Sequence, residues 1–171
     1  MRTVHVIQGE YKVSDDPEIV LTTILGSCVS MCLSDPVMRV RGMNYFLLPE
    51  GDNETAMGER YGLMAMELLV NGLLKLGARK DRMEAKLFGG AILNANLARI
   101  GDANAAFAKK FLSAEGITCR SSSLGGNQAR RIRYVPTTGA AQQMMLADHS
   151  DPVQPAARPK MPPPSDDIEL F

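Results

Sequence analysis

Cys28 is the residue of this 171-residue chain whose surroundings best suit chemistry, because it follows Gly26 and Ser27 at the start of an apolar run. A cysteine nucleophile must ionise, must be reachable and needs a proton donor for its leaving group. Gly26 permits unusual backbone angles and a close approach of substrate. The backbone N–H groups of Ser27 and Cys28 can point toward a developing oxyanion. The segment therefore indicates a catalytic cysteine, with a buried strand cysteine as the alternative.

Thr22 lies on the preceding apolar stretch, six residues before Cys28. If the chain turns at Gly26, the threonine hydroxyl can lie near the cysteine. We expect it to orient a base or the amide group of a substrate there.

The remaining cysteines and the histidines do not form a second reactive set. Cys32 stands four positions after Cys28, but no further Cys or His pair complements them, so we predict neither a metal nor a cofactor. We expect Cys32 and Cys119 to be core residues. His5 alternates with valines as on the polar face of a strand, and His149 begins a polar tail.

The composition excludes several classes of protein. The chain has 19 basic and 19 acidic residues and no basic stripe interleaved with aromatics, which argues against nucleic-acid binding. Its apolar segments carry charges and fall short of roughly 18 to 20 residues, so we predict no membrane span. The first residues lack the apolar region of a signal peptide, so we expect a cytoplasmic protein.

Short strands separated by turns dominate the first third of the chain. Residues 28–33 alternate with the period of a strand that has one buried face, and Asp35 and Pro36 mark a turn. Further strands are predicted at residues 3–8, 18–25, 39–47, 84–88, 117–123 and 131–136.

Two helices are predicted, at residues 60–76 and 103–115. Gly77 and Gly116 are placed to end them, and Asp102 is placed as the N-cap of the second. The first helix carries an apolar stripe that we expect in the core, made of Met64, Leu68, Leu69, Leu73 and Leu76.

The composition changes near residue 147. Six of the ten prolines lie in residues 152–164. We therefore predict one domain at residues 1–146 and a Pro-rich flexible tail at residues 147–171. The last residues alternate acidic and apolar side chains, which we interpret as a frayed terminus, with a short docking motif as the alternative.

Six short motifs stand in order along residues 5–145. They are Gly26-Ser-Cys28, Gly42-Met-Asn with Phe46-Leu-Leu-Pro49, Lys86-Leu-Phe-Gly-Gly-Ala91, Ile100-Gly with Asn104, Gly125-Gly126 with Arg130, and Thr138-Gly139. Together they resemble the CheD family, the chemoreceptor glutamine deamidases.

The resemblance implies both a fold and an activity. The fold is α+β, an α/β sandwich of mixed and antiparallel sheets with two main helices packed on one side. The activity is hydrolysis of glutamine side-chain amides on methyl-accepting chemotaxis receptors, which releases ammonia. In some bacteria the family also binds the phosphatase CheC. The family nucleophile falls on Cys28 and the family threonine on Thr22.

Tyr45 stands where the resemblance implies a histidine. A thiol without a base has a pKa of ~8.5 and is only about 3% thiolate at pH 7. A phenol with a pKa of ~10 is a poor base at neutral pH but a fair hydrogen-bond donor. We therefore expect Tyr45 to keep part of the acid role and little of the base role.

Two hypotheses follow from these residues. In the first, Cys28 attacks the carboxamide carbon of glutamine while the backbone near Ser27 and Gly26 binds the oxyanion. In the second, the protein keeps the fold and binds receptors or a CheC-like phosphatase, with catalysis weakened or lost because Tyr45 replaces the base. Deamidation is the function predicted here, and the adaptor is its alternative.

Overall fold

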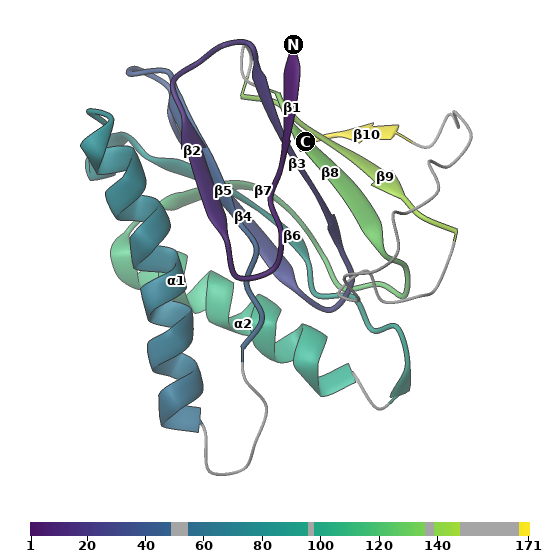
Figure 1. The fold of residues 1–171 in the computed structure, drawn as a ribbon. Coiled ribbons are helices and arrows are strands. Elements are labelled where there is room, and N and C mark those ends of the chain that lie inside the picture. Colours follow the sequence, from purple (N-terminus) through teal and green to yellow (C-terminus); the bar gives the residue numbers. More distant parts are fainter. Residues whose placement is uncertain (49–54, 96–97, 136–138, 148–167) are drawn as a thin grey trace.

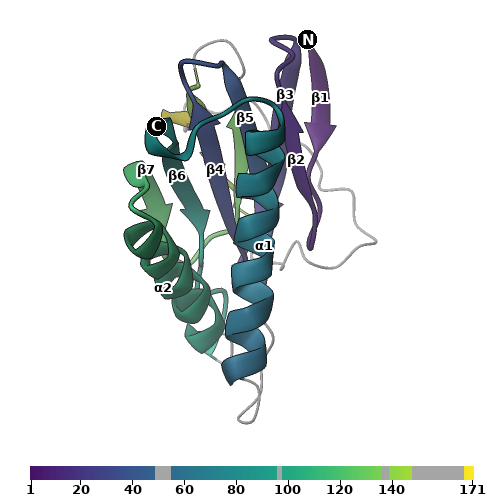
Figure 2. The same ribbon diagram turned by 90° about the vertical axis from the view of Figure 1, so that its left-hand side faces the viewer.

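The computed structural model describes residues 1–48, 55–95, 98–135, 139–147 and 168–171. Two five-stranded sheets pack face to face, and both helices cover the outer face of one of them (Figures 1 and 2). The order of strands is β1-β3-β8-β9-β10 in the first sheet and β2-β5-β4-β6-β7 in the second sheet. Each sheet mixes parallel and antiparallel pairs, so the predicted α+β sandwich is confirmed.

The elements of the first sheet come from both halves of the chain. Its strands are β1 (Arg2–His5), β3 (Ile19–Leu25), β8 (Arg130–Tyr134), β9 (Ala141–Met145) and β10 (Ile168–Leu170). β1 lies parallel to β3, and the other pairs are antiparallel.

The second sheet and its two helices occupy the middle of the chain. The strands are β2 (Tyr11–Ser14), β4 (Val29–Asp35), β5 (Val40–Asn44), β6 (Glu84–Gly89) and β7 (Thr118–Leu124). The helices are α1 (Thr55–Lys75) and α2 (Ala98–Glu115), with a short 3-10 turn at Lys80–Arg82.

Alternation along β4 and β5 divides the core into two layers. Val29, Met31 and Leu33 pack against the helices, whereas Cys28 and Cys32 face the first sheet. The period-two pattern predicted for residues 28–33 is therefore present. Both faces of the strand are buried, whereas one buried face was predicted.

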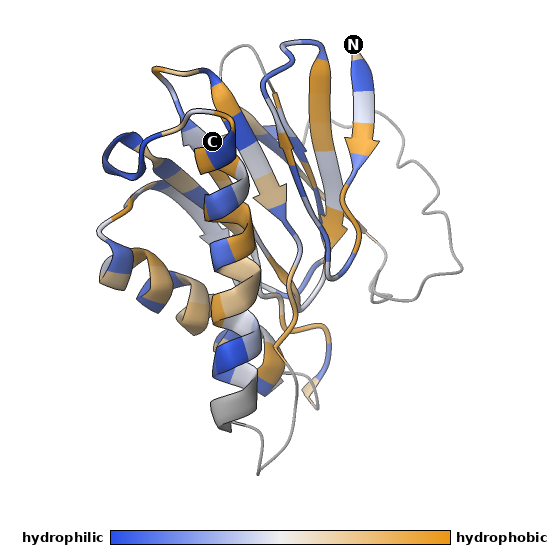
Figure 3. Ribbon diagram, turned by 60° about the vertical axis from the view of Figure 1, so that its left-hand side comes forward, coloured by the Kyte–Doolittle hydropathy of each residue, from blue (hydrophilic) through white to orange (hydrophobic). Residues whose placement is uncertain are grey.

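The apolar stripe predicted on the first helix is partly wrong. Leu69 and Leu73 are fully buried, but Met64 is 52% exposed and Leu68 is 43% exposed. The residue that fills the core one turn before Leu69 is Met66. Hydrophobic and hydrophilic residues alternate around α1 in Figure 3. The apolar side chains extend beyond the helix face that the sheet covers, so spacing alone did not identify the buried ones.

Both helices begin earlier than the sequence suggests. α2 begins at Ala98, so Asp102 lies inside the helix and the prediction that it is the N-cap is wrong. The C-terminal glycines are confirmed, since Gly77 and Gly116 have φ angles of 94° and 68° after the helix ends.

The last residues are ordered, so the interpretation of a frayed terminus is wrong for residues 168–171. β10 pairs antiparallel with β9, and the main chain of Phe171 exchanges two hydrogen bonds with Ala141, of 2.7 and 3.1 Å. The Phe171 ring packs edge-on against Phe88, with centroids 5.3 Å apart. Residues 148–167 lie outside the described part of the chain, so the division into a domain and a flexible tail stays a prediction.

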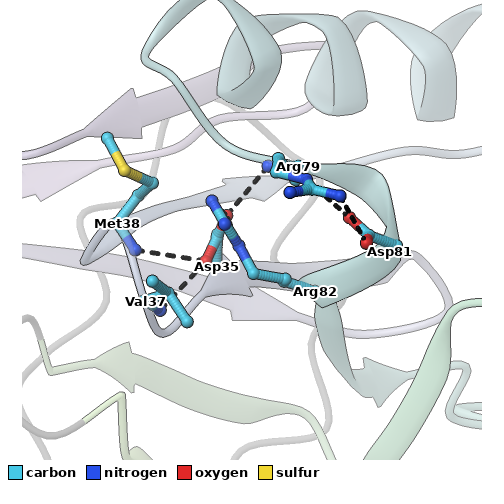
Figure 4. Close-up of polar contacts among 6 residues, drawn as sticks. All are labelled: Asp35, Val37, Met38, Arg79, Asp81 and Arg82. Atoms are coloured by element: carbon cyan, nitrogen blue, oxygen red, sulfur yellow. Dashed lines mark hydrogen bonds and ion pairs between the residues drawn. The ribbon is translucent and has the colours of Figure 1, made fainter.

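Asp35 fixes the end of the second sheet (Figure 4). Its side chain is fully buried. Oδ1 accepts the backbone N–H groups of Val37 and Met38 at 2.9 and 3.2 Å. Oδ2 accepts the N–H of Arg79 at 2.8 Å and the Arg82 guanidinium at 2.9 and 3.1 Å. One carboxylate thus joins the β4–β5 turn to the segment between α1 and β6.

Candidate active site

The cysteine lies in the three-residue connection between β3 and β4. This connection is held by the segment after β6, because the N–H of Ala91 donates to Gly26 at 3.0 Å and the N–H of Gly90 donates to Cys28 at 2.9 Å. Gly89 has a φ of 111°, and a Cβ there would stand 2.1 Å from the carbonyl oxygen of Cys28. Only glycine allows the end of β6 to approach the cysteine this closely.

Asn104 on α2 completes the support of this connection. Its Nδ2 donates to the carbonyl of Ser27 at 2.9 Å, and its Oδ1 accepts the N–H of Leu48 at 2.9 Å. The side chain is fully buried. Asn104 therefore ties the cysteine loop to the chain that follows β5, which carries Tyr45.

These contacts determine where the backbone N–H groups point. In a trans peptide the C=O and N–H groups of one plane point in opposite directions. The Gly26 carbonyl points to Ala91 and the Ser27 carbonyl points to Asn104. The N–H groups of Ser27 and Cys28 are therefore directed away from β6 and α2. N–H groups that point away from the supporting segments can face a substrate, as the donors of an oxyanion site must.

Cys28 and Tyr45 belong to the same layer between the two sheets. An antiparallel bridge joins Val29 to Phe46, with hydrogen bonds of 2.9 and 3.1 Å. This register makes Cys28 and Tyr45 diagonal neighbours on one face of the sheet, within reach of an aromatic side chain. The structure thus brings the predicted nucleophile and the tyrosine at the base position together.

Both side chains are covered. Cys28 is 0% exposed and Tyr45 is 5% exposed. A substrate must contact the sulfur for attack to occur. Attack by the Cys28 sulfur on a substrate would therefore require that the side chains covering it move aside.

Thr22 lies on β3 and is 4% exposed. Its hydroxyl donates to the carbonyl of Ile132 on β8 at 2.7 Å. The neighbouring Thr23 is buried as well and donates to the carbonyl of Val6 at 2.8 Å. Leu21 and Leu25 share the layer of Cys28, whereas Thr22 pairs with the exposed Arg133 on the opposite face of β3. The structure therefore does not bring the Thr22 hydroxyl to Cys28.

The other two cysteines, Cys32 and Cys119, differ in their exposure to solvent. Cys32 is fully buried, and burial raises the pKa of its thiol to about 12, so its prediction as a core residue is confirmed. Cys119 is exposed, so the same prediction is wrong for it. It lies on β7, which is an edge strand with its first residues in solvent.

The histidines take no part in the described site. His5 is exposed on β1, as expected for the polar face of that strand, and His149 lies outside the described residues. Across the described ranges no group of His, Cys, Asp and Glu could hold a metal ion. Nor does any helix in those ranges combine the length and apolar character needed to cross a membrane.

Asn104 is the functional residue that sequence reasoning missed. In the sequence it belongs to the motif Ile100-Gly with Asn104, which by itself predicts no role for its side chain. Its contact with Ser27 spans 77 positions, and nothing local in the sequence indicates such a distant partner. The available signal was a polar residue on the apolar face of a helix, where Ala108 and Leu112 are also buried at helical spacing.

Comparison with known proteins gives consistent matches. The family described as CheD chemotactic sensory transduction matches residues 47–144. A probable chemoreceptor glutamine deamidase CheD of Cereibacter sphaeroides (strain ATCC 17023) is 55% identical over 91% of this chain and 77% of its own length. Its counterpart in Rhizobium meliloti (strain 1021) is 50% identical over 99% of this chain and 96% of its own length. Among solved structures, the hypothetical protein YfiH of Bacillus licheniformis overlaps 66% of this chain and 49% of that one, with 15% identity and a TM-score of 0.46.

Proposed function

Because the chain belongs to the CheD family, we propose that it is an amidohydrolase that converts glutamine side chains of chemoreceptors to glutamate. The relatives that match most of its length are described as probable chemoreceptor glutamine deamidases. The substrates in this proposal are methyl-accepting chemotaxis receptors, and the protein acts on them from the cytoplasm.

The observation that carries the proposal is the geometry of the loop around Cys28. Its carbonyl groups are held by the segment after β6 and by Asn104, which directs the N–H groups of Ser27 and Cys28 away from these supports. Gly89 allows the close backbone contact with Cys28. A preorganised pair of donors next to a nucleophile is suited to acyl transfer from an amide.

The proposed reaction has two steps. The Cys28 thiolate attacks the carboxamide carbon, the carbonyl oxygen becomes an oxyanion bound by the two N–H groups, and the C–N bond breaks as ammonia leaves with an added proton. Water then hydrolyses the thioester, which yields glutamate and returns the thiolate. In this reaction Tyr45 donates the proton to the leaving nitrogen.

The test is deamidation of purified receptor cytoplasmic domains, followed by mass spectrometry of the receptor peptides. Wild-type protein should convert particular glutamines to glutamates, and Cys28→Ala should convert none. Cys32→Ala is the matched control, because it removes a buried thiol from β4, the strand that follows the loop, and leaves the loop itself unchanged. Equal conversion by wild type and Cys28→Ala would exclude the proposed nucleophile.

Tyr45 supports a second candidate function. With a phenol at the base position, the protein could bind chemoreceptors or a CheC-like phosphatase as an adaptor without turnover. In that case receptor pull-down would be equal for wild type and Cys28→Ala, and no glutamine would change mass. Failure to bind a receptor or such a phosphatase would exclude the adaptor.

A further inference from the structure

A polar cavity of about 410 Å³ opens between the two sheets at the end of the sandwich opposite Cys28. Its walls come from the β4–β5 turn, the first residues of β6 and β7, and the end of β8. The side chains that matter are Arg39, Arg41, Lys86, Arg120, Glu84 and Tyr134.

The register of the second sheet explains this position. Arg41 pairs with Ser34, and Ser34 pairs with Glu84. By alternation these residues share the inner face with Cys32 and Cys28. Six residues of strand separate Ser34 from Cys28, which corresponds to about 20 Å. The cavity is therefore distinct from the candidate active site.

Arg41 is the strongest sign of a missing ligand. It is 8% exposed, and its Nε is buried without a hydrogen-bond partner among the described residues. No ion pair of the described residues involves it. Burial also lowers the pKa of its guanidinium, although the neighbouring Tyr134 opposes this. An uncompensated buried charge is strongly unfavourable, so a cavity lined by this group favours an anion.

Two other cations surround the same space. Lys86 is half-buried and donates to the carbonyls of Gly139 and Phe171 at 3.0 and 2.6 Å, which leaves one of its three N–H groups. Arg39 has a φ of 57°, a left-handed conformation that is uncommon for a residue with a side chain. Glycine or asparagine would suit that turn better.

The carboxylate of the cavity is already neutralised. Glu84 pairs with Arg120, with an N–O distance of 2.8 Å. Besides this ion pair, the charged side chains that line the cavity are Arg39, Arg41 and Lys86, and all three are cations.

We propose that this cavity binds the phosphate group of a small phosphate monoester, with Arg41 as its principal ligand. Three convergent cations suit a dianion with several acceptor oxygens better than a single carboxylate. The hydroxyl groups of Ser34 and Ser121 also line the cavity and can donate to phosphate oxygens. The volume exceeds that of a phosphate ion and leaves room for a small organic group.

Thermal unfolding and calorimetry of the full chain test this proposal with inorganic phosphate and glycerol 3-phosphate as probes. Both should raise Tm and bind saturably, whereas sodium chloride of equal ionic strength and sodium acetate should not. Arg41→Met should weaken binding by about tenfold or more, since a buried charge-assisted contact is lost. Without a probe, Arg41→Met should unfold at the same or a higher temperature than wild type, because it removes an unpaired buried charge.

Arg133→Met is the matched control. Arg133 lies on β8 and is exposed, so the variant loses the same charge outside the cavity and should bind like wild type. The proposal is overturned if phosphate and chloride shift Tm equally, if acetate binds as tightly as phosphate, or if Arg41→Met binds phosphate like wild type. Since no readout requires deamidation, the result is independent of the function of Cys28.

Discussion

At the scale of single residues, the site depends as much on Asn104 as on Cys28. We predict that Asn104→Ala lowers stability by about 2 to 4 kcal/mol, because the Ser27 carbonyl and the Leu48 N–H lose their partner in a buried place. It should also lower kcat for receptor deamidation at a temperature where the variant is folded, because the Ser27 peptide plane is released. Urea denaturation and steady-state kinetics measure the two effects. Asn71→Ala is the control, since Asn71 is an exposed residue of α1; equal losses in both variants would contradict the assigned role.

Tyr45 gives the second prediction at this scale. Tyr45→Phe keeps the ring and removes only the hydroxyl, so it should lower the deamidation rate at least about tenfold if the phenol protonates the leaving nitrogen. Tyr45→His supplies a base for Cys28 and should raise the rate at pH 7 above that of wild type. Rates from receptor peptides and a melting curve for each variant separate chemistry from folding. An unchanged rate in Tyr45→Phe would remove the tyrosine from the proposed mechanism.

At the scale of elements, β10 is an unexpected part of the first sheet. Its last residue, Phe171, inserts between the sheets against Phe88 and presents its carbonyl to Lys86. The strand therefore closes the edge that β9 would otherwise expose, which protects a sheet from pairing with other chains.

We predict that Phe171→Ala lowers the free energy of unfolding by about 1 to 3 kcal/mol, since a partly buried aromatic pair is lost. Hydrogen exchange at the Ala141 N–H, which donates to Phe171, should become faster. Leu170→Ala is the control, because Leu170 is 72% exposed and should cost less than about 0.5 kcal/mol. Equal stability of the two variants would show that the strand adds nothing to the fold.

The elements also show how far the sequence predicts the fold. β4 was predictable because Cys28 to Leu33 alternate regularly, and β3 because its residues are apolar and β-branched. β2 was missed although Tyr11–Ser14 alternates apolar and polar residues, because four residues make a weak signal. β9 was missed because Ala141–Met145 shows no regular alternation.

The site was predictable to a similar degree. Cys28 and Thr22 were predicted from the segment around Gly26, and their roles stay predictions. The neighbours of Cys28 were not, because the contacts from Gly90 and Asn104 join parts of the chain that only the complete fold brings together. Arg41 was missed for the same reason, since its burial depends on the packing of one sheet on the other.

At the scale of the whole molecule, the inner layer between the sheets is apolar in its middle. One end holds the candidate nucleophile, and the other end holds charged side chains. Cys28 and Tyr45 lie at one end, and Arg41 and Lys86 at the other. The main contacts of the helices are with the second sheet, so strands supply most of this layer. Asp35 stands beside the charged end and joins the sheet to the segment that leads out of α1, so its ionisation bears on the stability of the complete fold.

Burial alone would raise the pKa of Asp35, but the hydrogen bonds from Arg82 and from the N–H groups of Arg79, Met38 and Val37 outweigh it and hold the pKa below its ordinary value of 3.8. A carboxyl whose pKa is lower in the folded state stabilises the protein above its unfolded pKa and loses that contribution as pH falls through the folded value. We therefore predict that the stability supplied by Asp35 is complete at pH 6 and is lost below a pH of about 3.8.

Comparison of Asp35→Asn with wild type by urea denaturation from pH 7 to pH 2.5 measures this effect. At neutral pH the variant should be less stable by about 3 kcal/mol, because Arg82 and the Arg79 N–H lose a buried acceptor. The difference in the free energy of unfolding between the variant and wild type should narrow as the pH falls below 3.8. Below that pH the Asp35 carboxylate of wild type becomes protonated, so wild type too lacks a charged acceptor. Asp81→Asn is the control, because Asp81 pairs with Arg79 at the surface with its side chain 63% exposed, where ion pairs contribute about 0 to 1 kcal/mol. A difference between Asp35→Asn and wild type that stays constant over this range would show that the carboxylate acts through its shape and not through its charge.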